Sequence, residues 1–177
     1  GLNWVTKFVS SNSINSIRFA DHNTGCAIGS NDIFSTTNAG ENWSQQTSPV
    51  NLTSIYFLSS SIAWICGNNG TILKTTNGGI NWINQISNTL QDFTSITAVD
   101  ENNCYCVGGG NIVLSTRDGG NTWNGSTLSD KIHESIYFTS KNTGYIISNL
   151  IHPDLYPYTD NVIFKTTDSG SSWNQIY

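Results

Sequence analysis

One eight-residue motif occurs four times in this chain, and it constrains the fold more strongly than any other feature. The motif begins with Thr, has Asn or Asp in third place and Gly in fifth, and ends with Trp. Its closing tryptophans are 39, 41 and 50 residues apart. A period near 40 residues is typical of stacked supersecondary units, so we expect one unit per motif. The shared residues are Thr36, Asn38, Gly40 and Trp43; Thr75, Asn77, Gly79 and Trp82; Thr116, Asp118, Gly120 and Trp123; and Thr166, Asp168, Gly170 and Trp173.

Three further segments precede each motif in a constant order. The first lies at 16–19, 54–57, 95–98 and 135–138, the second at 25–29, 63–67, 104–108 and 144–148, and the third at 33–35, 72–74, 113–115 and 163–165. Short runs separated by turn residues are typical of antiparallel strands. Because the second segment is apolar on both faces, we expect it to be buried between two layers. A repeated four-stranded meander covered on both faces is a propeller blade, so the sequence predicts an all-β chain of β-propeller blades.

The repeat also predicts where the blades begin and end. We expect four complete four-stranded antiparallel units at about 10–48, 49–87, 88–127 and 128–177. Gly1 and Trp4 match the end of the motif, so residues 1–8 are expected to form an extra outer strand of a preceding or neighbouring blade. Three alternatives follow: a fragment of a longer propeller, a compact closure with a spare strand, or pairing of the edge strands 1–8 and 173–177 with another subunit.

Each conserved position of the motif has a physical purpose in a hairpin. The Asn or Asp side chain can accept hydrogen bonds from backbone N–H groups of the turn. The Gly permits a positive φ that other residues adopt only at a cost. The Trp is expected to cover the hairpin and pack on the sheet, which gives these tryptophans a structural role.

The motif resembles the Asp-box, or bacterial neuraminidase repeat, with Asn38 and Asn77 in place of its Asp. The whole unit is most similar to the repeats of photosystem II assembly and stability factor-like propellers. The resemblance covers nearly the whole chain and implies a β-propeller. It also implies that the motif hairpins lie on the face opposite the ligand site. Related repeats occur widely in secreted bacterial proteins.

Charge and composition argue against several functions. The net charge is −5 and the seven Lys and Arg residues are dispersed, which argues against nucleic acid as a partner. No apolar run approaches the 18 residues of a membrane span. His22, His133 and His152 have no metal-ligand spacing, so we expect neither a metal nor another cofactor. Arg18 and Arg117 are the only arginines, too few for the three-arginine carboxylate site that the resemblance to sialidases would require.

An insertion at 149–160 distinguishes the fourth unit from the others. It falls between the second and third strands, and long loops in compact folds are often functional. Tyrosine is well suited to contacts because it is amphipathic and has few rotamers. The candidate binding residues are His152, Asp154, Tyr156 and Tyr158, with Trp64, Tyr56 and Tyr137 as weaker candidates.

These observations favour a non-catalytic binding or scaffolding module whose partner is a protein or a glycan. The first alternative is a structural subunit that self-assembles through its edge strands, and the second is part of a glycoside-active propeller with paired carboxylates. Only 11% of the residues are charged, and the polar residues are mainly Asn, Ser and Thr. We therefore expect an extracytoplasmic location: secreted, periplasmic or on the cell surface.

Overall fold

The computed structural model describes residues 6, 10–128, 132–151 and 159–177, and these residues form four antiparallel sheets with no α-helix among them. The strands of each sheet follow one another in chain order. This confirms the prediction of four four-stranded blades. The extra strand expected at 1–8 falls outside the described residues except for position 6.

The four sheets are numbered here as blades 1 to 4. Blade 1 contains β1 (Ile14–Phe19), β2 (Gly25–Gly29), β3 (Asp32–Thr36) and β4 (Ser44–Thr47). Blade 2 contains β5 (Leu52–Phe57), β6 (Ala63–Gly67), β7 (Ile72–Thr75) and β8 (Ile83–Asn84). Blade 3 contains β9 (Phe93–Ala98), β10 (Cys104–Gly108), β11 (Ile112–Thr116) and β12 (Asn124–Thr127), with a 3-10 turn at Gly109–Asn111. Blade 4 contains β13 (Ile132–Phe138), β14 (Gly144–Ile151), β15 (Thr159–Thr166) and β16 (Asn174–Gln175).

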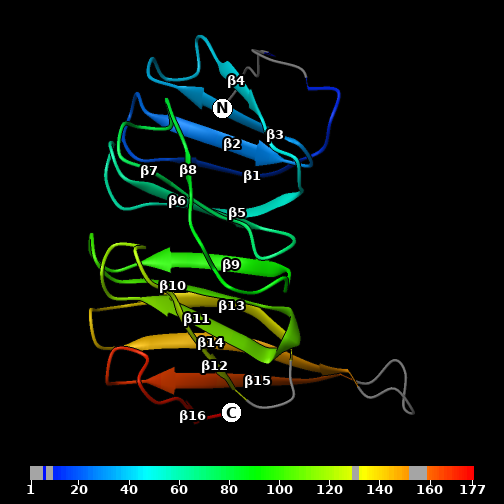
Figure 1. Ribbon diagram of the computed structural model, residues 1–177, viewed down its shortest axis with the longest axis vertical. Helices are drawn as coiled ribbons and strands as arrows, with labels where there is room; N and C mark the ends of the chain where they lie inside the picture. Colours follow the sequence, from blue (N-terminus) through cyan, green and yellow to red (C-terminus); the bar gives the residue numbers. More distant parts are fainter. Residues whose placement is uncertain (1–5, 7–9, 129–131, 152–158) are drawn as a thin grey trace, which may run out of the picture.

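The blades are stacked in sequence order, with their first strands β1, β5, β9 and β13 side by side (Figure 1). The hairpins between third and fourth strands lie along the left edge of Figure 1, and this side is called the motif face. The turns between second and third strands and the links between blades lie along the right edge, which is called the loop face. The motifs and the ends of β14 and β15 that flank the insertion of blade 4 therefore lie on opposite faces of the stack.

The hydrophobic core lies between the blades. Each blade has a trailing face, which packs on the next blade, and a leading face, which packs on the preceding one. Because neighbouring residues of a strand point to opposite faces, the second strands β6 and β10 contribute to two cores each. The core between blades 1 and 2 contains Cys26, Ile28, Ile33, Leu52, Ile55 and Ile65; that between blades 2 and 3 contains Trp64, Cys66, Ile72, Phe93, Ile96, Ala98, Cys104, Cys106, Leu114 and Trp123; that between blades 3 and 4 contains Tyr105, Val107, Val113, Ile136, Phe138, Ile146, Val162 and Phe164.

A bulge in the first strand of blades 1, 2 and 3 adds a polar connection to the next blade. The bulged residues Asn15, Thr53 and Thr94 lie outside the regular pairing with the second strand. Their side chains donate to the carbonyls of Leu52, Phe93 and His133 in the next blade, each at 2.7 Å. The bulges thus turn side-chain donors toward the neighbouring blade, a use typical of such irregularities.

Candidate binding face

The four motif segments form the same hydrogen-bonded turn, seen for instance in blade 3. The Thr116 hydroxyl accepts from the backbone N–H of Gly120 at 2.9 Å and donates to Asp118 Oδ1 at 2.8 Å. The same Oδ1 accepts from the backbone N–H of Thr122 at 2.9 Å. Equivalent bonds join Thr36, Asn38, Gly40 and Asn42; Thr75, Asn77, Gly79 and Asn81; and Thr166, Asp168, Gly170 and Ser172.

The two motifs with Asp form one bond more than the two with Asn. Asp118 Oδ2 accepts from the Thr122 hydroxyl, and Asp168 Oδ2 from the Ser172 hydroxyl, both at 2.6 Å. These hydroxyl bonds, followed by the backbone bonds, lower the pKa of both carboxyls to about 2. The carboxylates are therefore ionised and committed to the turn, which leaves them unsuited to act as general acids near neutral pH.

The motif glycines bring each hairpin against the preceding blade. A Cβ on Gly79, Gly120 or Gly170 would lie 2.7, 2.8 or 2.9 Å from side-chain atoms of Cys26, Trp64 and Tyr105 respectively. All three glycines have a positive φ. The motif face is thus built for contact between blades.

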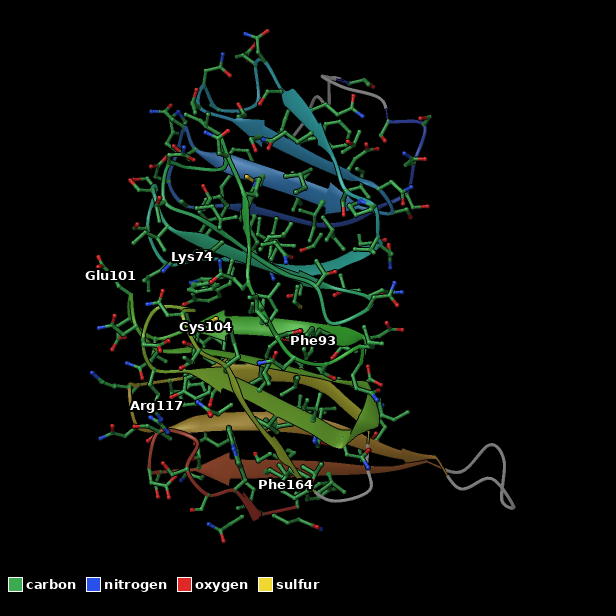
Figure 2. All side chains as sticks on the ribbon, in the orientation of Figure 1. Lys74, Phe93, Glu101, Cys104, Arg117 and Phe164 are labelled. Carbon is green, nitrogen blue, oxygen red and sulfur yellow. The ribbon has the colours of Figure 1, made fainter. Side chains whose placement is uncertain are left out.

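Cations of two blades reinforce these contacts on the motif face. Lys74 Nζ lies 4.6 Å from the centre of the Trp64 ring and donates to the Gly119 carbonyl at 2.7 Å. Arg117 Nη2 donates to the Ser169 carbonyl at 3.1 Å. Figure 2 shows both cations at the left edge of the stack, away from Phe93. Their charges therefore serve the connection of successive blades.

The predicted binding residues His152, Asp154, Tyr156 and Tyr158 lie outside the described residues. The strands that flank them are described: β14 and β15 have eight residues each, where β2 and β3 have five. The ends of these two longer strands extend beyond the other blades on the loop face (Figure 1).

Trp64, one of the weaker candidates, is not available to a ligand, so this prediction is wrong. Its side chain is wholly buried on the trailing face of blade 2, where it meets Trp123 edge-to-face at 5.8 Å. Tyr56 is partly buried, and burial raises its pKa. Tyr137, the equivalent residue of blade 4, is exposed. Tyr56 is the more buried of the two because blade 3 packs against it, whereas no described blade packs against Tyr137.

A wide, open depression of about 650 Å³, called the cavity below, lies on the loop face of blade 2. It lies between the β6–β7 turn and the link to blade 3, and none of the described residues that line it is charged. Ile86 and Leu90 are 72% and 83% exposed, respectively. The lining residues are Asn69, Gly70, Thr71, Asn84, Gln85, Ile86, Ser87, Asn88, Thr89 and Leu90.

Backbone bonds hold the two walls of this cavity together. Gly70 N–H donates to the Gln91 carbonyl at 2.8 Å, and Asn69 N–H donates to Asp92 Oδ1 at 2.9 Å. A Cβ on Gly70 would lie within 2 Å of the Thr89 carbonyl oxygen, so only glycine permits this approach. The cavity is therefore preformed, which is usual for ligand sites.

Sequence reasoning missed this cavity because the link between β8 and β9 does not share the repeat. The available signal was two isolated aliphatic residues, Ile86 and Leu90, in a link otherwise rich in Asn, Ser, Thr and Gln. Neither residue has a counterpart in the strand pattern. In the folded chain both side chains are exposed and line the cavity.

No three His, Cys, Asp or Glu side chains in the described ranges are grouped so as to hold a metal ion. The same ranges contain no helix that could cross a membrane. Two further carboxylates are held by neighbouring side chains: Asp32 accepts from Asn12 and Gln45 at 2.8 Å each, and Asp100 pairs with Lys141 at 3.0 Å.

No protein-family model and no curated protein sequence matches the chain. Solved β-propeller structures do match. An ancestral GH74 enzyme has a TM-score of 0.73 at 17% identity, over 92% of this chain and 25% of its own. The GH74 xyloglucanase of Xanthomonas campestris has a TM-score of 0.70 at 11% identity, over 92% and 30%. YCF48 bound to D1 peptide has a TM-score of 0.60 at 14% identity, over 96% and 82%.

The chain thus spans a quarter of the length of the first of these structures. At such identities the likeness establishes the propeller fold alone.

Proposed function

We propose that the chain is a non-catalytic, extracytoplasmic propeller module that binds protein segments on its loop face. The observation that carries this proposal is the preformed cavity between the β6–β7 turn and residues 84–90, with its amide and hydroxyl lining. Such groups pair with the backbone of an extended peptide, while Ile86 and Leu90 offer apolar contacts to its side chains.

The described residues that line the cavity include no charged side chain and no aromatic ring, and this limits the kinds of ligand that the cavity suits. An uncharged lining favours a peptide segment without clustered Lys, Arg, Asp or Glu. A sugar ring would find no flat apolar surface to stack on there. The structure of YCF48 bound to D1 peptide supports the proposal by showing that a propeller of similar fold holds a peptide.

The competing proposal is glycoside hydrolysis, which the two GH74 neighbours bring to mind. Hydrolysis needs two carboxyl groups facing each other across a cleft, about 5–10 Å apart. The hydrogen bonds of Asp32, Asp118 and Asp168 support a structural role for these carboxylates. We expect no reducing sugar to be released from xyloglucan, and sustained turnover there would refute a non-catalytic role.

A peptide library displayed on phage, selected against the 177-residue chain, tests the binding proposal. Leu90→Asp and Ile86→Asp place a charge in the cavity and are expected to weaken the selected peptides at least tenfold in fluorescence anisotropy. The matched control is Ile80→Asp, which changes a residue of similar exposure in the motif hairpin of blade 2. Equal affinity for all three variants would contradict a site in this cavity.

A further inference from the structure

Three of the four motif tryptophans pack edge-to-face against another aromatic ring. The distances between ring centres are 6.1 Å for Trp43 and Phe19, 5.8 Å for Trp123 and Trp64, and 6.0 Å for Trp173 and Phe138. Aromatic pairs favour this arrangement. Among the described residues, no ring stands in the same relation to Trp82, the motif tryptophan of blade 2.

The absence of this contact in blade 2 follows from one residue of β6. In blade 1, Phe19 lies opposite Gly25, where a Cβ would meet the ring at 2.6 Å. Blade 4 has the same pair of phenylalanine and glycine. In blade 2 the residue opposite Phe57 is Ala63, whose Cβ keeps a ring from that position. Trp82 is therefore left without the contact.

Trp82 instead lines a pocket of about 320 Å³ between the outer parts of blades 1 and 2, called the anchor pocket below. Ile33, Pro49 and Leu73 complete its apolar wall. None of the described residues that line it is charged. Trp82 is only partly buried, whereas Trp123, its equivalent in blade 3, is 6% exposed. Part of the Trp82 indole is therefore accessible to a ligand.

The anchor pocket is continuous with the cavity on the loop face, because Thr71 and Asn84 line both. A ligand in the cavity can therefore extend into the anchor pocket along blade 2. Toward the motif face the pocket is bounded by Gln46, whose side-chain amide donates to the carbonyls of Gly79 and Ile80 at 2.9 and 3.2 Å. These bonds join blades 1 and 2, so the walls are in place before a ligand binds.

We propose that the anchor pocket binds an aromatic side chain of the peptide that occupies the cavity, an inference that rests on the proposed function. The peptide ring gives Trp82 the contact that the other motif tryptophans have within the chain. A volume of about 320 Å³ is at the lower end for ligand sites, which suits a single ring. One aromatic anchor beside weaker polar contacts is a common division of binding energy.

Leu73→Phe fills the anchor pocket from within the chain. Leu73 lines this pocket and not the cavity. Its equivalents in blades 1 and 4 are Phe34 and Phe164, so the fold accommodates phenylalanine at this position. Ile83→Phe is the matched control, because Ile83 is next to Trp82 in the chain, is 61% exposed and lines neither site.

Fluorescein-labelled peptides, selected from a phage library against the unmodified chain, test the proposal by fluorescence anisotropy. They are expected to share one aromatic residue, whose replacement by Ala weakens binding about tenfold or more. Replacement by Leu keeps apolar burial but loses the ring contact, so we expect binding to weaken about fivefold. The Leu73→Phe chain should bind the original peptide as weakly as the unmodified chain binds the Ala peptide. The Ile83→Phe chain should bind it as tightly as the unmodified chain does.

The anchor pocket and the proposed function fail in different ways. Peptides that are weakened by Leu90→Asp, but not by Leu73→Phe or by loss of their aromatic residue, would overturn the anchor pocket and leave binding in the cavity intact. Peptides weakened by Leu73→Phe and not by Leu90→Asp would support the anchor pocket and contradict the cavity. A library that yields no binding peptide would overturn both.

Thermal unfolding checks that each variant is folded. If Leu73→Phe does not fold, nuclear Overhauser contacts between the peptide ring and the Trp82 indole of the unmodified chain decide the question. Their presence supports the anchor pocket, and their absence in a saturated complex overturns it.

Discussion

The hydroxyl of Tyr105 donates a hydrogen bond to the carbonyl of Ser169, 2.8 Å away, and so joins the second strand of blade 3 to the motif hairpin of blade 4. The Tyr105 ring also stacks on Phe138 at 4.3 Å. Tyr105→Phe keeps the stacking and removes the bond, so we expect a loss of about 1 kcal/mol in the free energy of unfolding. Urea denaturation measures this loss. Tyr137→Phe, which changes an exposed tyrosine of blade 4, serves as the control and should leave the midpoint unchanged.

Asp118 is expected to make the stability of the fold dependent on pH below 4. Hydrogen bonds from Thr122 lower its pKa from 3.8 to about 2 in the folded chain. A carboxyl whose pKa is lowered by folding stabilises the fold above its unfolded value, and this contribution disappears as the pH falls from about 4 to 2. Urea midpoints across this range should therefore fall more steeply in the unmodified chain than in Asp118→Asn. Thr122→Ala, which removes one donor, should give an intermediate slope; identical slopes in all three would contradict this assignment.

His133 gives a second dependence on pH, at higher values. It is wholly buried between blades 3 and 4, and burial lowers its pKa below 6.5. The unfolded chain therefore takes up a proton first as the pH falls below 6.5, and the folded state loses stability there. Its Nδ1 lies 2.7 Å from the Ser148 hydroxyl. Blade 3 has Phe93 and Gly108 in these two places.

The double variant His133→Phe with Ser148→Gly gives blade 4 the same pair as blade 3. We expect it to flatten the decline in stability between pH 7 and 5, as measured by thermal unfolding in buffers of matched ionic strength. Changing both residues avoids leaving the buried serine hydroxyl without its partner. A decline as steep as that of the unmodified chain would mean that another group is responsible.

Ala39 occupies a backbone conformation that suits glycine. Its φ is 60°, and the motifs of blades 2 and 3 have Gly78 and Gly119 in the same place with φ of 71° and 72°. Ala39→Gly is expected to raise the free energy of unfolding by about 1 kcal/mol, because a side chain is strained in this region. The reverse change, Gly78→Ala, should destabilise the chain by at least as much. Chemical denaturation of both variants checks the sign.

The strand order could be predicted because it depends on local patterns. The alternation of apolar residues, the Gly of each motif and the polar turns repeat in register, and each acts within one blade. The burial of Trp64 depends on the neighbouring blade instead. Alignment of the second strands places Trp64 with Cys26 and Tyr105, all on trailing faces, but only the stacked arrangement shows that the next motif glycine covers them.

The cavity on blade 2 could not be predicted from the repeat, because its outer wall is the link after β8. That strand has two residues, where β4 and β12 have four. The chain leaves the sheet early, and Asn88 adopts a positive φ of 57° within the link. The path of this link depends on tertiary contacts, such as the hydrogen bond from Gly70 N–H to the Gln91 carbonyl. A periodic sequence pattern does not encode such contacts.

The side-chain bonds of Asn15, Thr53 and Thr94 also bear on how the stack would respond to force. Each backbone ladder stays within its own blade, while these donors cross from one blade to the next. Tension applied along the stack would act on these side-chain hydrogen bonds one after another. Each blade depends only on its immediate neighbours. The chain should then extend in discrete steps of one blade, giving a sawtooth trace under an atomic force cantilever.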